Sequence, residues 1–238
     1  MDECLGIVGP NGECTGGGGD GGYDYPGGGD PEPEDPKTPC DKTKGILTNP
    51  EVQAKIDDLK TKSTGTLENA YKFKADGTPS NLIVGNAHSV NFGDKTGYQG
   101  GYHNHTTGTE IFSPADIEQL LQFALVQGNY GNPSNAYVGM VASNGMHYVI
   151  QFNGNYNDAL VSYSQEDLDA YAIRYQTRYG MISSNNSIGN EAIERFFFKT
   201  VRDMGLDDKI ILQRIENDGI IKAISRNNDG SINAVPCI

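Results

Sequence analysis

Two histidines separated by a single residue, His103 and His105, constrain this chain more than any other feature of its sequence. Successive side chains of an extended strand alternate between its two faces, so both imidazoles of a strand over this segment point the same way and can share one ion. Ser113 is a good helix N-cap and Pro114 a good first helical residue, which places Asp116 in the first turn of a helix.

Two imidazoles and one carboxylate form a three-ligand set. Zinc held by three protein ligands keeps a fourth position open to water, as in catalytic rather than closed structural sites. We therefore predict a metal site built from His103, His105 and Asp116. Each half also has a simpler interpretation, because Ser113 and Asp116 form a capping box without a metal, and a His-x-His pair can be two ordinary strand histidines. Only the joint pattern favours a metal.

The joint spacing, His-x-His followed by seven residues and Ser-x-x-Asp, resembles the signature of the JAB/JAMM (MPN-domain) metalloproteases. The triplet His-Asn-His makes the bacterial RadC-like JAB domains the closest resemblance, although Thr106 stands where these families usually have proline. The resemblance covers roughly residues 66 to 153. It implies a mixed sheet flanked by helices, with Zn2+ bound by His103, His105 and Asp116.

The family also requires an upstream glutamate as general base. The best candidate is Glu68, in a segment where Tyr71 replaces the usual glycine. Glu51 is the alternative, although an acid in the first turn of a predicted helix also complements the helix dipole. The resemblance assigns Ser113 to stabilising the oxyanion. It implies a zinc-dependent metallopeptidase or isopeptidase that hydrolyses an amide of a peptide or protein substrate through a metal-bound water.

Two other functions stay open. The chain can be a catalytically inactive JAB-like binding module, or a C-terminal effector or toxin domain of a larger secreted bacterial protein. A nuclease of the HNH type is disfavoured, because the three residues are contiguous here and the net charge of the chain is -13. No Lys/Arg-rich patch that could bind nucleic acid is visible, and no apolar run resembles a signal peptide or a membrane span.

Residues 1–39 carry nine acids and one lysine, together with twelve glycines and six prolines. Such a segment buries too little apolar surface to offset its conformational entropy, so we predict a disordered acidic linker over residues 1–39. A chain that opens on a linker suggests a part of a larger polypeptide.

Two of the four cysteines, Cys40 and Cys237, bracket the predicted folded body. Domain termini often lie close together, so a disulfide between them is reasonable, with free cysteines in a cytosolic protein as the alternative. The even number of cysteines favours an oxidising setting, and we expect an exported or cell-surface location in a bacterium.

We predict an α+β fold, an α/β sandwich, whose JAB/MPN-like core spans residues 40–153 and whose C-terminal helical and strand extension, residues 154–238, packs on that core. His147 is expected to be a strand surface residue rather than a fourth ligand, and His88 lies in a polar loop. Periodicity and turn signals predict helices after Asn49, Ser113, Ser164 and Asn190, and strands over 70–74, 82–84, 98–105, 135–142, 146–152, 210–215 and 220–224.

Overall fold

A computed structural model describes residues 7–8, 14–15, 37–106, 110–183 and 189–237. The chain divides into two units, Met1–Pro36 and Lys37–Ile238. In the first unit, strands β1 (Ile7–Val8) and β2 (Cys14–Thr15) pair antiparallel inside the segment predicted to be a linker. The rest of that predicted linker up to residue 36 lies outside the described residues.

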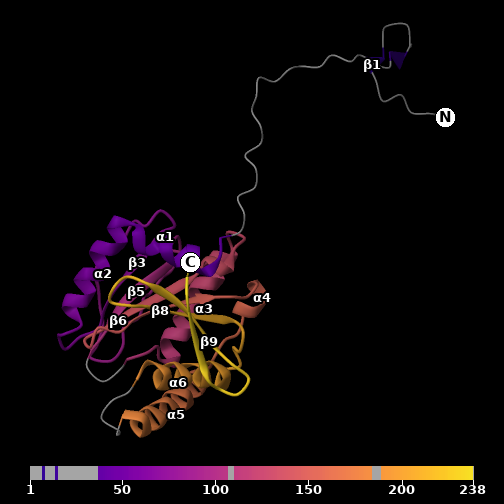
Figure 1. The fold of residues 1–238 in the computed structure, drawn as a ribbon. Coiled ribbons are helices and arrows are strands. Elements are labelled where there is room, and N and C mark those ends of the chain that lie inside the picture. The colour runs from indigo at the N-terminus through magenta and orange to yellow at the C-terminus, as the bar shows by residue number, and fades with distance from the viewer. Residues whose placement is uncertain (1–6, 9–13, 16–36, 107–109, 184–188, 238) are drawn as a thin grey trace. The chain divides into compact units, whose positions relative to one another are not determined.

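The second unit is built on one eight-stranded sheet with the order β10-β9-β8-β7-β6-β5-β3-β4. One pair, β5 and β6, is parallel, and every other neighbouring pair is antiparallel. This mixed sheet, seen edge-on among its helices in Figure 1, confirms the predicted α+β sandwich. The strands are β3 (Asn69–Phe73), β4 (Ile83–Val84), β5 (Gly100–His105), β6 (Tyr137–Ala142), β7 (His147–Phe152), β8 (Ile210–Ile215), β9 (Ile221–Arg226) and β10 (Ile232–Pro236).

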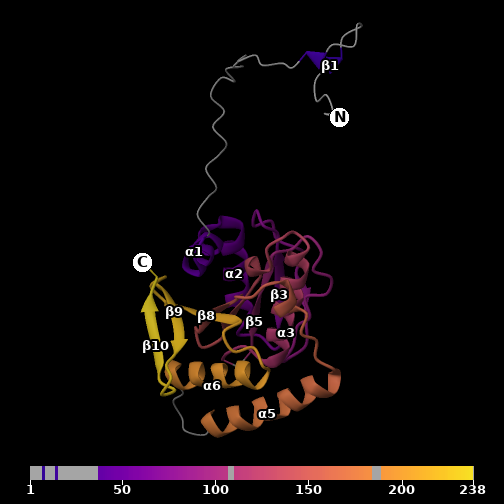
Figure 2. The same cartoon turned by 90° about the vertical axis from the view of Figure 1, so that its right-hand side faces the viewer.

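Helices cover both faces of the sheet (Figure 2). On one face, α2 buries Val52, Ile56 and Leu59 against Tyr102 and Val149. On the other face, the apolar side chains of α3 and α6 pack on those of β6, β7 and β8. None of the helices that the structure describes is long and apolar enough to cross a membrane. The helices are α1 (Pro39–Thr48), α2 (Pro50–Lys62), α3 (Pro114–Gly128), α4 (Tyr156–Ala159), α5 (Gln165–Ser183) and α6 (Asn190–Asp203), with a 3-10 turn, η1 (Pro133–Asn135).

The segment after residue 153 extends the same sheet, because β8 pairs with β7 and continues into β9 and β10. Its two long helices add a layer over one face. The sequence did not indicate α1, α4 or β10. Helix α1 begins at Pro39, with Thr38 and Asp41 forming a capping box, so ordered structure starts inside the segment predicted to be a linker.

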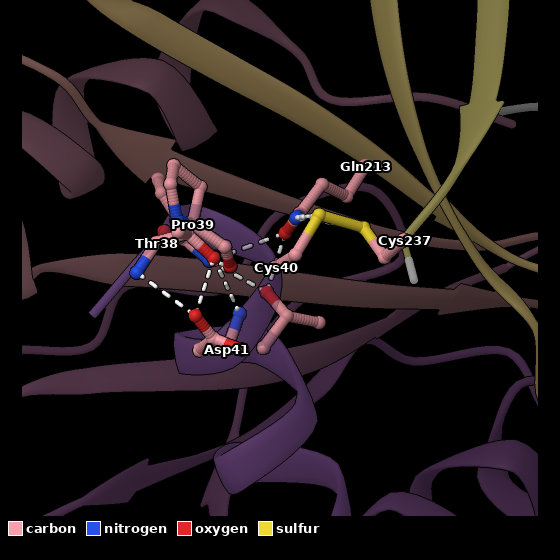
Figure 3. The surroundings of a disulfide bond; sticks show 8 residues. Thr38, Pro39, Cys40, Asp41, Gln213 and Cys237 are labelled. Carbon is pink, nitrogen blue, oxygen red and sulfur yellow. Dashed lines mark hydrogen bonds between the residues drawn. A yellow bond between two sulfur atoms is a disulfide. The ribbon is translucent and has the colours of Figure 1, made fainter.

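A disulfide between Cys40 and Cys237 joins α1 to the end of the chain, which confirms that bridge (Figure 3). Beside it, three buried polar side chains bond to one another. The hydroxyl of Thr43 donates to Gln213, and Gln151 donates to both Thr43 and Gln213. Helix α1 is therefore held by a covalent bond and a buried polar network, in addition to the partly buried Ile46 and Leu47 that pack against the core.

Replacing both Cys40 and Cys237 by serine should destabilise the second unit without changing its fold. The disulfide closes a loop with a sequence separation of 197 residues, and loop-closure entropy for such a length gives about 5 kcal/mol as an upper limit, with about 2 kcal/mol at the low end of measured values. Urea unfolding of the oxidised wild type and the double variant measures the difference. A loss well below 1 kcal/mol would contradict the assigned role of the disulfide.

Candidate metal centre

Strand β5 places His103 and His105 on the sheet face that α3 covers, as strand alternation requires. Both side chains are buried, and their Nε2 atoms lie 2.7 Å apart. Phe92 and Phe112 pack against the His103 ring with centroid distances of 5.9 and 6.2 Å. The two imidazoles therefore converge on one point inside a largely apolar wall.

Asp116 reaches the same point from the first turn of α3. Its Oδ1 lies 3.2 Å from Nε2 of His103, and its Oδ2 lies 3.5 Å from Nε2 of His105. The same Oδ2 accepts hydrogen bonds from the backbone N–H and the hydroxyl of Ser113, at 2.7 and 2.8 Å. Burial alone would raise the pKa of Asp116, but the charge of His103 and hydrogen bonds from both imidazoles hold that pKa well below its ordinary value.

Glu68 is a second acid of this region and immediately precedes β3. Its carboxylate lies with the two imidazoles in a buried group whose ligand atoms are all within 4.8 Å of one another. Burial raises the pKa of Glu68 to about 7; the positive charge of His105 opposes this shift, and the negative charge of Asp116 adds to it. This buried Glu-His-His group could hold a metal ion.

The spacing of the donor atoms agrees only in part with a tetrahedral metal site. Nitrogen and oxygen atoms bound to one tetrahedral zinc at 2.0–2.1 Å lie about 3.3 Å apart. The Asp116 oxygens lie 3.2 and 3.5 Å from the imidazole nitrogens, close to this spacing, whereas the two Nε2 atoms are only 2.7 Å apart. A second feature also differs from typical centres. A metal-bound histidine normally donates its other ring N–H, whereas Nδ1 of His103 and Nδ1 of His105 are buried with no hydrogen-bond partner among the described residues.

Asn104, between the two histidines, fixes the backbone on both sides of Glu68. Its Oδ1 accepts the N–H of Asn69 at 2.9 Å, and its Nδ2 donates to the carbonyl of Leu67 at 3.2 Å. The backbone of Glu68 itself bonds to the other side, with Asn86 and Gly85 at 2.8 Å each. The strand that carries the imidazoles thus also sets the position of the glutamate.

The remaining candidates lie elsewhere. Glu51 is exposed on α2, where its N–H is capped by Asn49, and His88 is exposed in a loop. The expectation that His147 is a strand surface residue is wrong. It is 8% exposed on the sheet face covered by α2, where its Nε2 lies 3.3 Å from the hydroxyl of Tyr102. Helix α2 covers this face of the sheet, whereas the sequence around His147 gave no sign that a helix would bury it.

Sequence reasoning missed the contribution of α5. The hydroxyl of Tyr175 donates to the carbonyl of Ile111 at 3.0 Å, next to the metal-binding group. Burial raises the pKa of Tyr175 well above its ordinary value, and the charges of Asp116, Glu110 and Glu68 contribute to that shift. One feature of the sequence could have indicated this contact. The face of α5 that packs on the core carries tyrosines where leucine would be usual, and a buried tyrosine hydroxyl needs a hydrogen-bond partner.

No family model, curated protein or solved structure matches this chain. The resemblance to JAB/JAMM metalloproteases therefore rests on the spacing and identity of the residues described above.

Replacing Asn104 by alanine should weaken metal binding without removing a ligand. The variant leaves the N–H of Asn69 unpaired in a buried position, which costs about 1 to 3 kcal/mol, and it releases the backbone on both sides of Glu68. We expect a lower free energy of unfolding and a lower affinity for zinc, measured by urea unfolding and by competition with a chromophoric chelator. Asn91→Ala is the matched control, since Asn91 caps Gly93 in an exposed loop. Equal zinc affinities of both variants would refute this role.

His147 should make the protein less stable in mild acid. Burial, together with the charge of Lys60, lowers its pKa to about 3, so the unfolded state takes up a proton near pH 6.5 while the folded state does not. The stabilising effect of a neutral His147 is complete above about pH 6.5 and decreases by about 1.4 kcal/mol per pH unit below it.

Glu68 has the opposite dependence, because its raised pKa favours the folded state as the pH falls through about 7. The effect of His147 is therefore measured as the difference in unfolding free energy between wild type and His147→Gln at pH 7.5 and at pH 5.5. We expect the wild type to lose more stability than the variant on acidification. A difference that does not change with pH would contradict the prediction.

Proposed function

We propose that this protein is a zinc-dependent metallohydrolase of the JAB/JAMM type that cleaves a peptide or isopeptide amide. The observation that supports the proposal most directly is the buried group of Glu68, His103 and His105, with the Asp116 carboxylate against both imidazoles. An acid, two histidines and an enclosed apolar wall are what a hydrolytic metal centre needs.

His103, His105 and Asp116 would hold the zinc ion through Nε2 and carboxylate oxygens. When bound, zinc supplies a Lewis acid that polarises the amide carbonyl and lowers the pKa of a water molecule. Glu68 accepts the proton of the attacking water and passes it to the leaving amine. A carboxyl group with a pKa of about 7 is suited to both transfers, because it can take up and release a proton near neutral pH.

Ser113 acts first as a positioning residue. Its hydroxyl donates its hydrogen to Asp116, and the same carboxylate receives the backbone N–H of Ser113. The oxyanion role implied by the family resemblance requires that the hydroxyl exchange this bond for one to the substrate during the reaction. Ser113 therefore orients a ligand in the resting site and stabilises the oxyanion only after that exchange.

A second function, a JAB-like binding module without catalysis, is favoured by one observation. Within the part of the chain that the structure describes, the Nδ1 atoms of both histidines lack the acceptors that usually strengthen metal binding. The hydrogen bonds among Asp116 and the two imidazoles can also close this site by themselves.

We further propose an exported location in a bacterium. The proposal is supported by the disulfide between Cys40 and Cys237, since disulfides persist mainly in oxidising compartments.

Elemental analysis and a cleavage assay test the proposed reaction. We expect one zinc per chain, and cleavage of a proteome-derived peptide library detected by mass spectrometry. Glu68→Gln should lower the cleavage rate at least about 100-fold, because it removes the general base. His103→Ala should lose both zinc and activity. Glu51→Gln is the matched control, since it removes the other candidate glutamate from an exposed helix.

If the wild type binds zinc but cleaves peptides no faster than Glu68→Gln and His103→Ala, catalysis at this centre is excluded. Zinc binding without any cleavage would favour the binding module. A protein that takes up no zinc would remove the basis of both the reaction and the ligand assignment.

A further inference from the structure

Glu110 lies beside the metal centre and is not used by the reaction proposed above. It precedes Ile111 and Phe112, which are fully buried, and these lead into Ser113 and the metal-binding end of α3. The Oε2 atom of Glu110 is buried and has no hydrogen-bond partner in the described part of the chain. A buried carboxylate oxygen without a partner is unfavourable, so a missing partner is expected to be a cation or a strong donor.

The wall around this carboxylate is aromatic. The hydroxyl of Tyr179 on α5 forms a hydrogen bond with Glu110, which contributes to raising the pKa of Tyr179, after burial and the charge of Glu110, to about 12. The ring of Tyr179 stacks on that of Tyr175, with centroids 6.1 Å apart and an interplanar angle of 4°. Phe196 of α6 packs against both rings at 4.7 and 5.9 Å. Tyr179 is only half-buried, so this wall is open on one side.

Glu110 also belongs electrostatically to the metal centre. The hydroxyl of Tyr175, whose pKa the negative charges of Asp116, Glu110 and Glu68 help to raise, donates to the carbonyl of Ile111, the residue after Glu110. The next residue, Phe112, packs its ring 6.2 Å from that of His103. The two arginines of α5 are engaged with other groups. Arg178 forms an ion pair with Asp203, and Arg174 lies over the ring of Tyr171. Neither therefore supplies the partner of Glu110.

The charge balance of the centre indicates what is missing. Three carboxylates exceed the two positive charges of a zinc ion by one. An alkyl chain ending in an ammonium or guanidinium group complements such a place, because its stem packs on aromatic rings while its head pairs with the free carboxylate oxygen.

We propose that Glu110 is a specificity-determining residue that selects substrates carrying an ammonium or guanidinium group next to the cleaved amide. This inference rests on the proposed metallohydrolase function and names its substrate class. The alternative is that Glu110 only anchors α5 through Tyr179, in which case its charge has no effect on ligand choice.

Hydroxamates that bind the zinc ion separate these possibilities without requiring catalysis. We would titrate the zinc-loaded full chain calorimetrically with three probes of similar size. Nα-acetyl-lysine hydroxamate carries a side-chain ammonium, norleucine hydroxamate carries an α-ammonium, and Nα-acetyl-norleucine hydroxamate carries neither. The wild type should bind one of the two cationic probes at least about tenfold more tightly than the neutral probe, and high salt should reduce that preference. The probe that is preferred identifies the position of the charge.

Glu110→Gln should abolish the preference and leave the affinity for the neutral probe within about twofold of wild type. Tyr179→Phe should retain the preference, because the carboxylate remains. Glu166→Gln is the matched control, because it removes an exposed charge from α5, the helix that carries Tyr179. This variant should behave as wild type. A wild type that binds the neutral probe equally well, or a preference that persists in Glu110→Gln, overturns this inference while the metallohydrolase proposal stands. If no zinc is taken up, both proposals fail.

Discussion

The contact between Asp116 and the imidazoles of His103 and His105 is the interaction on which the rest of the structure depends. One carboxylate closes the N-terminal turn of α3 through Ser113 and also faces the Nε2 atoms of β5. The capping interpretation and the metal interpretation of this segment are therefore compatible, since the capping bonds hold the carboxylate beside both imidazoles, where it could also bind a metal ion. Burial of a charge in this position is tolerated because donors surround it on two sides.

The elements that the sequence predicts are those fixed by short-range chemistry. Asn49 with Pro50, and Ser113 with Pro114, start helices where cap and proline preferences place them. The buried residue of helix α1 is the polar Thr43, and its apolar Ile46 and Leu47 are only partly buried, so its position depends also on Gln213, about 170 residues away, and on the disulfide. The wall that α5 adds near the metal centre is equally non-local, so the stripe of tyrosines indicated a helix but not what it covers.

The group that could hold a metal ion was predicted only in part, for the same reason. Alternation along β5 predicts that His103 and His105 share a face, whereas nothing local predicts which glutamate joins them. Glu68 immediately precedes a strand and Glu51 lies in the first turn of a helix, so neither position is distinguished by its local sequence. The pairing of β3 with β5 is what brings Glu68 to the histidines. His147 shows the limit of alternation, since it gives the face of a strand but not whether a helix buries that face.

Asn104 explains why a neutral amide stands between the two histidines. The backbone pairing of β3 with β5 runs as far as Ala70 opposite His103. At Asn69 the side chain of Asn104 accepts the N–H that a backbone carbonyl would otherwise take. The backbone at Glu68 can then turn away from β5 and donate its N–H to Asn86, while the buried N–H of Asn69 keeps a partner. This departure from the regular ladder lies next to Glu68, whose carboxylate reaches the imidazoles, so the strand end that carries the two histidines also sets the backbone of the proposed base.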